Sequence, residues 1–417
     1  MSTLIVGPSP PLEGVVEIGG AKNSVLKLMA ATVLCPGRFR LANVPRISDV
    51  EWMGEVLRAV GATIAWADDT TLDIDVPTDP SPETPYELVE RMRASTALLG
   101  PLLARCGEAR IALPGGDDFG PRPINLHLAA LEQMGAEFEL RHGMISGRAQ
   151  RLRGARILLE YPSVGATETV MLAGSLAEGT TTIENAAREP EIADLAAFLN
   201  RMGAKVIGAG STTVTVEGAS ELHPVAHRVM PDRIEAATFL CALAVAGGEI
   251  TLRNAVLDDL SSVARKLGSM GVRVASGPNE IWAMRSSPLT ATDVATLPYP
   301  GVPTDVLPML VAALATAAGT SFATENLFGG RFRYVGELGR MGAEIAVEGH
   351  HLVIDGVPRL SGAPVRAFDI RAGAALVVAA LAADGETVIH DAEHLERGYA
   401  DLAGRLSAIG AVVSRLE

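Results

Sequence analysis

Charged residues recur at one position of the sequence, at the start of stretches that otherwise read as buried helices. Six apolar runs end at a glycine, and about fourteen positions before each glycine stands a residue that is charged in five of the six cases. A buried helix accommodates a charge only at its end, where the charge meets solvent or a ligand. Lysine and arginine are unfavourable beside the positive end of a helix dipole unless an anion binds among them. We therefore predict a shared anion site that includes Lys22, Arg93, Gly165, Arg233, Asp305 and Arg371.

Ordinary surface charges at the ends of core helices are the alternative for each member of this set. Arg233, for example, could simply pair with Asp232 or Glu235. The constant spacing favours a site for the group as a whole.

The segment 113–123 breaks the pattern and is the second place where chemistry is expected. Its glycines and prolines replace a shorter strand-to-helix connection, and glycine hinges are typical of a mobile lid. The loop carries two adjacent aspartates, Asp117 and Asp118, close to Arg122. A carboxyl group there could serve as a general acid, although the same residues also suit a solvated turn. A metal site is the weaker interpretation, because no further carboxylate or histidine cluster lies nearby in the sequence.

Two other patterns lead to no site. The segment Gly19–Ser24 superficially looks like a phosphate loop, but the Walker spacing is absent. The pairs His223/His227 and His390/His394 have helical spacing without a glutamate base or a third ligand. They therefore favour surface or core histidines over zinc ligands.

The elements that must position these residues repeat six times. Each copy reads Leu-x-x-apolar-Gly-small and continues with an alternating strand pattern, and successive copies lie about seventy residues apart. The pattern predicts an amphipathic helix that ends at a glycine C-cap and is followed by a strand. The glycines of this marker are Gly61, Gly135, Gly203, Gly271, Gly342 and Gly410, and those that end the upstream apolar runs are Gly37, Gly107, Gly179, Gly248, Gly319 and Gly385.

The composition excludes several classes of protein. The 417 residues suffice for two or three domains, and 48% hydrophobic residues with only 4% aromatic ones predict cores of Ala, Val, Leu and Gly. The net charge of -14 argues against nucleic acid as a partner. The longest apolar runs are too short to cross a bilayer, and no signal peptide is visible. Three cysteines without paired spacing, Cys35, Cys106 and Cys241, indicate a reduced, cytoplasmic protein.

Ten motifs in order give the sequence a specific resemblance over essentially its whole length. It resembles the bacterial UDP-N-acetylglucosamine enolpyruvyl transferases (1-carboxyvinyltransferases), within the superfamily that includes enolpyruvylshikimate phosphate synthase. Each motif alone is weak, whereas ten at matching spacing are specific. The motifs are Gly20–Asn23, Met92–Ser95, Pro114–Gly116, Arg122–His127, Ser163–Thr167, Asn185–Glu191, Pro231–Arg233, Pro303–Asp305, Asp369–Ala372 and Arg397–Tyr399.

The resemblance implies an α/β fold, namely a two-domain inside-out α/β barrel of six repeated βαβαββ-like units, three in each domain. It places the first domain at residues 21–229, with the mobile loop at 113–123. Residues 1–20 and 230–417 would form the second domain. The active site is expected in the cleft between the two domains.

The resemblance also implies a reaction. The enzyme would transfer the enolpyruvyl group of phosphoenolpyruvate to the 3-hydroxyl of UDP-N-acetylglucosamine and release phosphate, in the first committed step of peptidoglycan precursor synthesis. This family works by addition and elimination through a tetrahedral ketal, with no metal and no organic cofactor. The expected partners are therefore the two small-molecule substrates, with no nucleic acid, no membrane and no obligate protein partner.

The motifs carry over four catalytic residues, Asp117, Asp305, Lys22 and Arg397. Asp305 is expected to accept the proton of the sugar hydroxyl, and Asp117 to form an acid–base pair with it. A useful general acid would need a pKa raised toward neutrality. Nearby cations would lower the pKa of Asp117, whereas bound phosphate, the substrate carboxylate and Asp118 would raise it, so its ionisation state stays open.

The same motifs imply the substrate contacts. Lys22, Arg122 and Arg397 would hold the phosphate, while Arg331 and Arg371 would hold the carboxylate or close the cleft. The full set of expected substrate-binding residues is Lys22, Asn23, Arg93, Arg122, Pro123, Ile124, Asn125, Leu126, Ser163, Val164, Gly165, Asp305, Leu327, Arg331, Asp369 and Arg371.

The sequence departs from the family pattern at several positions. Most members carry cysteine where Asp117 stands, and a carboxylate is a poorer nucleophile toward an epoxide than a thiolate is. We therefore predict resistance to the epoxide phosphonate fosfomycin, with proton donation retained. Tyr161, Asn125, Leu307 and Pro308 also differ, at positions near the diphosphate, the uracil and the catalytic aspartate.

Two alternatives stay open at this point. The departures could mark a paralogue that transfers the enolpyruvyl group to another nucleotide such as UMP in a secondary pathway. A catalytically silent nucleotide-sugar-binding protein is the other alternative. The presence of Lys22, Asp305 and Arg397 argues against a silent binder, because binding alone does not need an acid–base apparatus.

Overall fold

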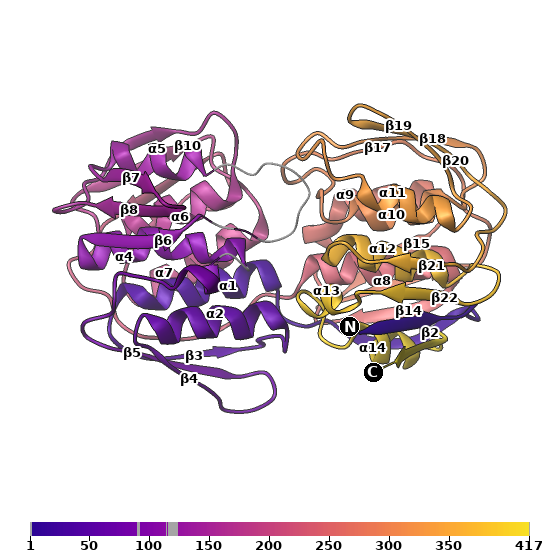
Figure 1. Cartoon of the computed structure of the whole chain (residues 1–417), viewed down its shortest axis with the longest axis horizontal. Coiled ribbons are helices and arrows are strands. Elements are labelled where there is room, and N and C mark those ends of the chain that lie inside the picture. Colours follow the sequence, from indigo (N-terminus) through magenta and orange to yellow (C-terminus); the bar gives the residue numbers. More distant parts are fainter. Residues whose placement is uncertain (1, 90–91, 114, 116–123, 417) are drawn as a thin grey trace. The chain divides into compact units, whose positions relative to one another are not determined.

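The computed structural model describes residues 2–89, 92–113, 115 and 124–416. The chain divides into two compact units (Figure 1). The first unit comprises residues 20–115 and 124–230, and the second comprises residues 2–19 and 231–416. Each is built from three small sheets and the helices that pack against them.

The first unit contains the strands β3 (Gly37–Ala42), β4 (Thr63–Trp66), β5 (Leu72–Val76), β6 (Glu108–Ala112), β7 (Glu137–Arg141), β8 (Met144–Arg148), β9 (Arg156–Leu158), β10 (Thr180–Glu184), β11 (Lys205–Ile207), β12 (Thr213–Glu217) and β13 (Ala226–Arg228). Two of its sheets have four strands, in the orders β13-β3-β5-β4 and β11-β12-β10-β9. The third has three described strands, in the order β6-β8-β7.

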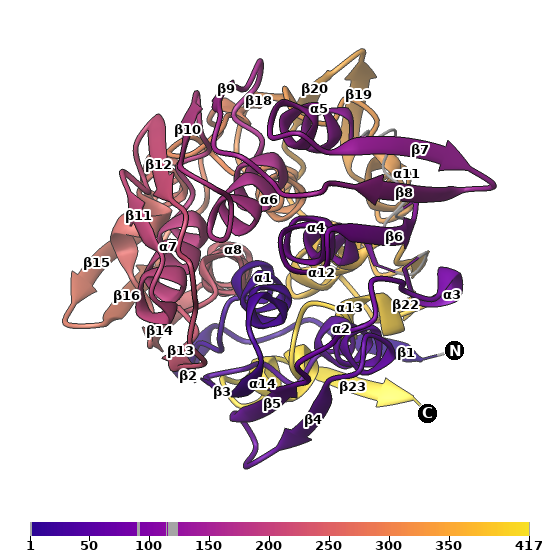
Figure 2. The ribbon, with the colours of Figure 1, turned by 90° about the vertical axis from the view of Figure 1, so that its left-hand side faces the viewer.

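The helices of the first unit are α1 (Lys22–Ala31), η1 (Thr32–Leu34), α2 (Ser48–Ala59), α3 (Tyr86–Val89), η2 (Arg93–Leu98), α4 (Leu99–Cys106), α5 (Asn125–Gln133), α6 (Val164–Gly174) and α7 (Pro190–Met202). Figure 2 shows α1, α4 and α6 in the middle of this unit, with the strands arranged around them. Helix α4 packs on α6, and η2 contacts both α1 and α6. Every residue from Ala166 to Gly174 of α6 is buried, as expected for a helix that is enclosed on all sides.

The strands of the second unit are β1 (Thr3–Val6), β2 (Leu12–Glu17), β14 (Gly248–Arg253), β15 (Arg273–Gly277), β16 (Glu280–Arg285), β17 (Val294–Ala295), β18 (Thr320–Thr324), β19 (Glu344–Glu348), β20 (His351–Asp355), β21 (Pro364–Arg366), β22 (Thr387–His390) and β23 (Val413–Leu416). They form three sheets, in the orders β21-β22-β1-β23, β15-β16-β14-β2 and β17-β18-β20-β19. The two N-terminal strands thus lie beside strands from the C-terminal half of the chain.

The helices of the second unit are α8 (Arg233–Ala246), η3 (Leu257–Leu260), α9 (Ser261–Ser269), α10 (Leu307–Leu314), α11 (Arg333–Arg340), α12 (Ile370–Ala380), α13 (Glu393–Glu396) and α14 (Leu402–Ser407). Helices α8, α10 and α12 pack against one another in pairs. All residues of α10 and α12 are buried, so these helices form the middle of the unit as α1, α4 and α6 do in the first.

The six repeats appear as six sheets within the described residues, three in each unit, with helices inside. The predicted inside-out α/β barrel of repeated units is therefore confirmed. All twelve marker glycines have a positive φ, between 74° and 115°, which explains why glycine recurs there. At the helix ends this left-handed conformation closes the last turn and turns the chain into the next strand.

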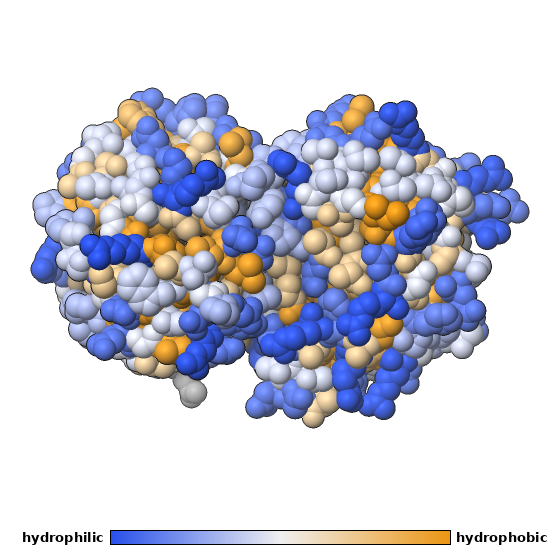
Figure 3. Space-filling view, turned by 180° about the vertical axis from the view of Figure 1, so that it is seen from behind, coloured by the Kyte–Doolittle hydropathy of each residue, from blue (hydrophilic) through white to orange (hydrophobic). Residues whose placement is uncertain are grey.

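The apolar residues of this composition lie mainly in the two cores, and hydrophilic residues cover much of the face drawn in Figure 3. Apolar residues occur between them on that face in smaller groups. In the part of the chain that the structure describes, no helix has the length and apolar character needed to cross a bilayer.

Candidate active site

The repeated charged position lies at helix starts, as the sequence predicts. Lys22, Arg93 and Arg233 are the first residues of α1, η2 and α8, and Gly165 and Arg371 are the second residues of α6 and α12. Five of the six positions thus place their residue in the first turn of a helix that packs in the middle of its unit.

Two of these starts differ in detail from the prediction. Arg93 opens a 3-10 segment rather than an α-helix, because Pro101 cannot donate the backbone bond that would extend α4 upstream. Asp305 lies two residues before α10 and not inside it. The reason is Pro308, the second residue of α10, which favours the first turn of a helix and so fixes its start at Leu307.

The second unit brings three predicted site residues into direct contact. The Oδ1 atom of Asp305 lies 2.8 Å from Nη1 of Arg331, and its Oδ2 atom lies 3.1 Å from Nη2 of Arg371. Both arginine side chains are 4% exposed, whereas that of Asp305 is 25% exposed. One carboxylate is therefore oriented by two buried cations and keeps access to solvent.

Both arginines stay charged. Burial lowers the pKa of Arg331, but the negative charges of Asp305 and Asp369 raise it by more, so its pKa lies above the usual value. Burial likewise lowers the pKa of Arg371, and the interactions with Tyr399 and Asp305 outweigh that effect. Both guanidinium groups therefore keep their positive charge at physiological pH.

Asp369 shapes this cluster as a helix cap. Its Oδ1 atom accepts hydrogen bonds from the backbone N–H groups of Arg371, at 2.8 Å, and Ala372, at 2.9 Å. An aspartate at this position satisfies free N–H groups at the start of α12. Asp369 thus fixes the backbone that carries Arg371.

The motif Arg397–Tyr399 lies against the same arginine. The guanidinium carbon of Arg371 is 5.4 Å from the ring centroid of Tyr399, whose hydroxyl lies 2.9 Å from Oγ1 of Thr238. Gly398 packs closely on the start of α12, because a Cβ atom there would come within 2.7 Å of Ile370. Arg397 is half-buried at the C-terminal end of α13.

In the first unit, Lys22 pairs with an aspartate that the sequence analysis did not single out. The Nζ atom of Lys22 lies 2.9 Å from Oδ2 of Asp49, and the two side chains are 10% and 3% exposed. Gly20 precedes them at a tight approach, since a Cβ atom there would lie 1.7 Å from the carbonyl oxygen of Asn43. Asn23, one residue after Lys22, is exposed.

The start of α6 is built around His127. Ser163 caps the helix by accepting a hydrogen bond from the backbone N–H of Ala166 at 3.3 Å. Nδ1 of His127 lies 2.9 Å from Oγ1 of Thr169, and a Cβ atom on Gly165 would come within 2.8 Å of the His127 ring. Burial, and then nearby positive charges, lower the pKa of His127 to about 3. The imidazole is therefore neutral at physiological pH and supports the backbone at Gly165.

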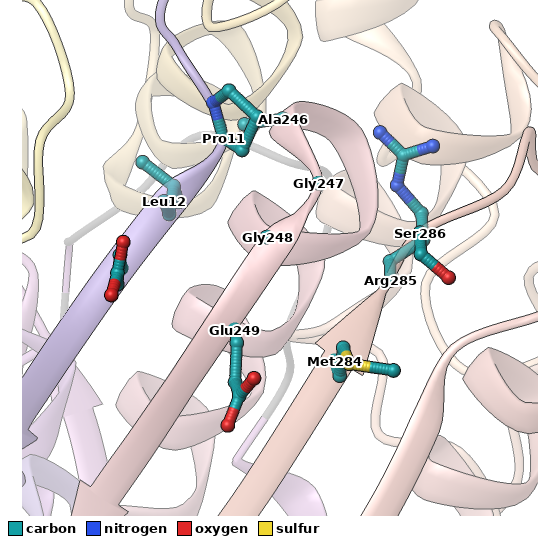
Figure 4. Close-up of a pocket in the computed structure, with 10 residues that line it drawn as sticks. Pro11, Leu12, Ala246, Gly247, Gly248, Glu249, Met284, Arg285 and Ser286 are labelled. Carbon is teal, nitrogen blue, oxygen red and sulfur yellow. The ribbon is translucent and has the colours of Figure 1, made fainter.

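A pocket of about 510 Å³ lies elsewhere in the second unit, where β2, β14 and β16 meet (Figure 4). Glu13, Glu249 and Arg285 are its charged residues, and Figure 4 shows Glu249 and Arg285 pointing away from each other. Of the predicted site residues that the structure describes, none lines this pocket. It is therefore not the place where the predicted chemistry would occur.

Known proteins match this chain over most of its length. The family model described as EPSP synthase (3-phosphoshikimate 1-carboxyvinyltransferase) matches residues 6–406. The chain belongs to this family. The resemblance predicted from the motifs is thereby confirmed.

Curated members of the family match the chain over almost its whole length. The UDP-N-acetylglucosamine 1-carboxyvinyltransferase of Mycobacterium bovis is 48% identical over 405 residues, which is 97% of each chain. That of Corynebacterium jeikeium is 46% identical and covers 100% of this chain and 99% of its own.

Solved structures of family members share the fold. The enolpyruvyl transferase NikO from Streptomyces tendae superposes with a TM-score of 0.90 at 30% identity, over 99% of both chains. EPSP synthase from Acinetobacter baumannii gives 0.77 at 18% identity over 100% of both chains, which supports the fold alone.

Some of the predicted site residues lie outside the clusters around Asp305, Lys22 and His127. Others belong to the part of the chain that the structure does not describe. Ile124 is buried, Leu126 is half-buried, and Asn125 begins α5 with an exposed side chain. The backbone N–H of Leu327 donates to Glu325, and Val164 is half-buried at the first position of α6. Asp117, Arg122 and Pro123 lie outside the described residues.

Two functional candidates escaped the sequence reasoning, Asp49 and Glu325. Asp49 is a buried acid in the first turn of an amphipathic helix. In the sequence it cannot be distinguished from an ordinary exposed acid at a helix start. Glu325 follows β18 at a position where three other repeats carry asparagine, so comparison of the repeats could have found it.

Proposed function

We propose that this chain transfers the enolpyruvyl group of phosphoenolpyruvate to the 3-hydroxyl of UDP-N-acetylglucosamine and releases phosphate, in the first committed step of peptidoglycan precursor synthesis. Relatives that are 46–48% identical over nearly the full length bear the name of this transferase. The single structural observation that carries the proposal is the Asp305 carboxylate held between Arg331 and Arg371.

The chemistry needs three things from the protein. C3 of phosphoenolpyruvate must receive a proton, C2 must carry a developing positive charge, and the sugar hydroxyl must lose its proton. Asp305 suits the last task, because its carboxylate is oriented by two guanidinium groups and remains partly exposed. Asp117 is the proposed partner in proton transfer.

The substrate anions need fixed cations. Arg331 and Arg371 are buried and charged, and we assign them to the carboxylate of phosphoenolpyruvate or to closure around it. Lys22, Arg122 and Arg397 are the proposed phosphate ligands. The Lys22–Asp49 ion pair supports this role, since it holds the ammonium group in place before an anion arrives.

The proposed acceptor contacts belong to the first unit and to Leu327. The capped start of α6 presents Ser163, Val164 and Gly165, and a helix N-terminus favours negatively charged ligand groups such as a diphosphate. The remaining proposed contacts are Asn23, Arg93, Pro123, Ile124, Asn125, Leu126 and Asp369.

We also propose a cytoplasmic location. All three cysteines are free, and burial raises the pKa of the Cys35 thiol to about 11, so this group stays protonated and unreactive. Unpaired cysteines are typical of proteins in a reducing compartment.

The test is phosphate release from phosphoenolpyruvate by the purified chain, with UDP-N-acetylglucosamine, with UMP and without acceptor. We expect release only with the nucleotide sugar. Release with UMP alone would indicate that the enzyme is a paralogue that transfers the enolpyruvyl group to another nucleotide. No release with either acceptor, together with retained UDP-N-acetylglucosamine binding by calorimetry, would indicate a silent binder and overturn the proposal.

A further inference from the structure

In three of the six repeats, an asparagine side chain forms a hydrogen bond between the ends of two neighbouring strands. Asn43, Asn185 and Asn254 each stand six positions after an upstream marker glycine, with φ of 59°, 55° and 51°. Each side-chain amide donates to the carbonyl oxygen of the residue that follows the parallel neighbouring strand. The bonds are Asn43 to Val229 at 2.9 Å, Asn185 to Leu159 at 2.9 Å and Asn254 to Ile18 at 2.7 Å.

In the repeat that carries Asp305, this position is Glu325, and the asparagine is shifted by one. Asn326 donates to the carbonyl oxygen of Thr296, which follows the parallel strand β17, at 3.0 Å. The scaffold's strand-end bond is therefore made without Glu325. Glu325 is nevertheless 1% exposed, and a buried carboxylate is costly unless it is fully hydrogen-bonded.

The two oxygens of Glu325 serve different segments. Oε1 accepts from the hydroxyl of Thr296 at 2.8 Å and from the backbone N–H groups of Leu327, at 2.8 Å, and Phe328, at 3.1 Å. Oε2 accepts from the hydroxyl of Thr304 at 2.7 Å. One oxygen thus fixes the segment of a proposed acceptor contact, and the other fixes the residue before Asp305.

The direction of the hydrogen bond between Thr304 and Glu325 affects how Thr304 binds Arg331 of the catalytic cluster. A threonine hydroxyl has a single hydrogen, and here it points to Glu325, so the lone pairs of Oγ1 are left for another donor. Nη1 of Arg331 donates to this Oγ1 atom at 3.0 Å and to Oδ1 of Asp305 at 2.8 Å. Both hydrogens of Nη1 therefore have a fixed acceptor.

We propose that Glu325 is a positioning residue of the transfer reaction. Its Oε2 atom orients the Thr304 hydroxyl so that Arg331 is held on the Asp305 carboxylate, while Oε1 independently fixes the segment at Leu327. Glu325 touches no reacting atom and acts through Thr304 and Arg331. The inference rests on the proposed function, because it assigns Asp305 and Arg331 their roles in that reaction.

Thr304→Val and Glu325→Gln are the decisive variants. Valine removes the oxygen that accepts from Arg331, and glutamine turns the Oε2 acceptor into a donor while its amide oxygen still serves the three bonds of Oε1. We expect either change to lower kcat with UDP-N-acetylglucosamine by about tenfold or more, the factor that about 1.4 kcal/mol of barrier corresponds to. The KM for the nucleotide sugar should stay within about twofold, because the segment at Leu327 keeps its bonds.

Three further proteins make the result specific. Thr304→Ser keeps the hydroxyl and should recover most of the kcat that Thr304→Val loses. The double variant Thr304→Val/Glu325→Gln should be no slower than the slower single one, since both changes break the same chain of bonds. Thr320→Val is the matched control, because the Thr320 hydroxyl on β18 also donates to a carboxylate, that of Asp355 at 2.6 Å, on the exposed surface. It should behave as the unaltered protein.

Unaltered kcat in both single variants, or additive losses in the double variant, would overturn the proposal. A lower kcat accompanied by a clearly higher KM for the nucleotide sugar and a lower melting temperature would indicate a purely structural role. This result would overturn the proposal as well. Failure of the proposed function is distinguishable, because the unaltered protein itself would then release no phosphate with UDP-N-acetylglucosamine.

Discussion

An ion pair between Lys27 and Glu168 joins α1 to α6 in the middle of the first unit. Breaking this pair should lower the stability of the unit. The two side chains are 16% and 2% exposed, so solvent screens the pair little. Burial raises the pKa of Glu168 above its usual value, the charge of Lys27 opposes this shift, and the charges of Glu191 and Glu189 add to it. Lys27 therefore compensates a carboxylate that the fold has removed from water.

Replacing Lys27 by methionine keeps the length of the side chain and removes its charge. Breaking a buried pair from one side costs about 3–5 kcal/mol, because the remaining charge is uncompensated. For a unit of this size, 1 kcal/mol shifts the melting temperature by about 2–4 °C, so the first unit should melt about 6–20 °C lower. Replacing both Lys27 and Glu168 by methionine should recover most of this loss, since apolar residues of similar size need no compensation.

The pH dependence of this loss has a definite sign. A carboxyl group whose pKa is raised by folding binds its proton more tightly in the folded state, so stability falls as pH rises above its unfolded pKa of about 4.3. Without Lys27 the pKa of Glu168 rises further, and the loss should grow from pH 5 to pH 8. Thermal unfolding of the single and double variants at both pH values measures it. A single variant that melts like the unaltered protein at pH 8, or equally low at both pH values, would refute the reasoning.

Three other outcomes follow from the site. Asp305→Asn should lower kcat by about 10²–10⁴-fold while calorimetry still detects UDP-N-acetylglucosamine binding; turnover close to that of the unaltered protein would remove Asp305 as the base. Gly20→Ala should destabilise the fold by about 3 kcal/mol or more in chemical unfolding, because its Cβ atom would lie 1.7 Å from the Asn43 carbonyl oxygen. Gly339→Ala, on the exposed side of α11 with open space around its Cβ position, is the control and should be neutral or slightly stabilising. Fosfomycin should not inactivate the enzyme over time, whereas the variant Asp117→Cys should become sensitive, and covalent labelling of the unaltered protein by mass spectrometry would contradict this.

The sequence was sufficient to predict the scaffold because its rules are local. A glycine with a positive φ at Gly61 or Gly271 is required by the backbone of a helix end, and that requirement is visible without any tertiary information. The repeat spacing then predicts six units. The repeat predicts that α10 begins at Asp305, whereas the local preference of Pro308 shifts the start to Leu307.

Site partners that come from different elements could not be predicted in the same way. Lys22 and Asp49 meet because α1 packs on α2, and neither spacing nor composition encodes which residues of two helices face each other. Arg331 and Asp305 were both expected in the site through the resemblance, but the bridging role of Thr304 depends on a hydrogen-bond direction. Such directions follow only from the positions of all the partners.

The repeat itself offers a criterion for separating scaffold residues from site residues. Where a position makes the same hydrogen bond in several copies, as Asn43 and Asn254 do, the fold explains which residue stands there. In one copy the neighbouring residue, Asn326, makes this bond instead, so the residue at the original position must serve another purpose. Glu325 meets this criterion in the repeat whose charged position carries an acid, Asp305, in place of a base. The two departures lie in the same repeat and are connected through Arg331, which is the arrangement expected if one copy of a structural unit has acquired the catalytic role.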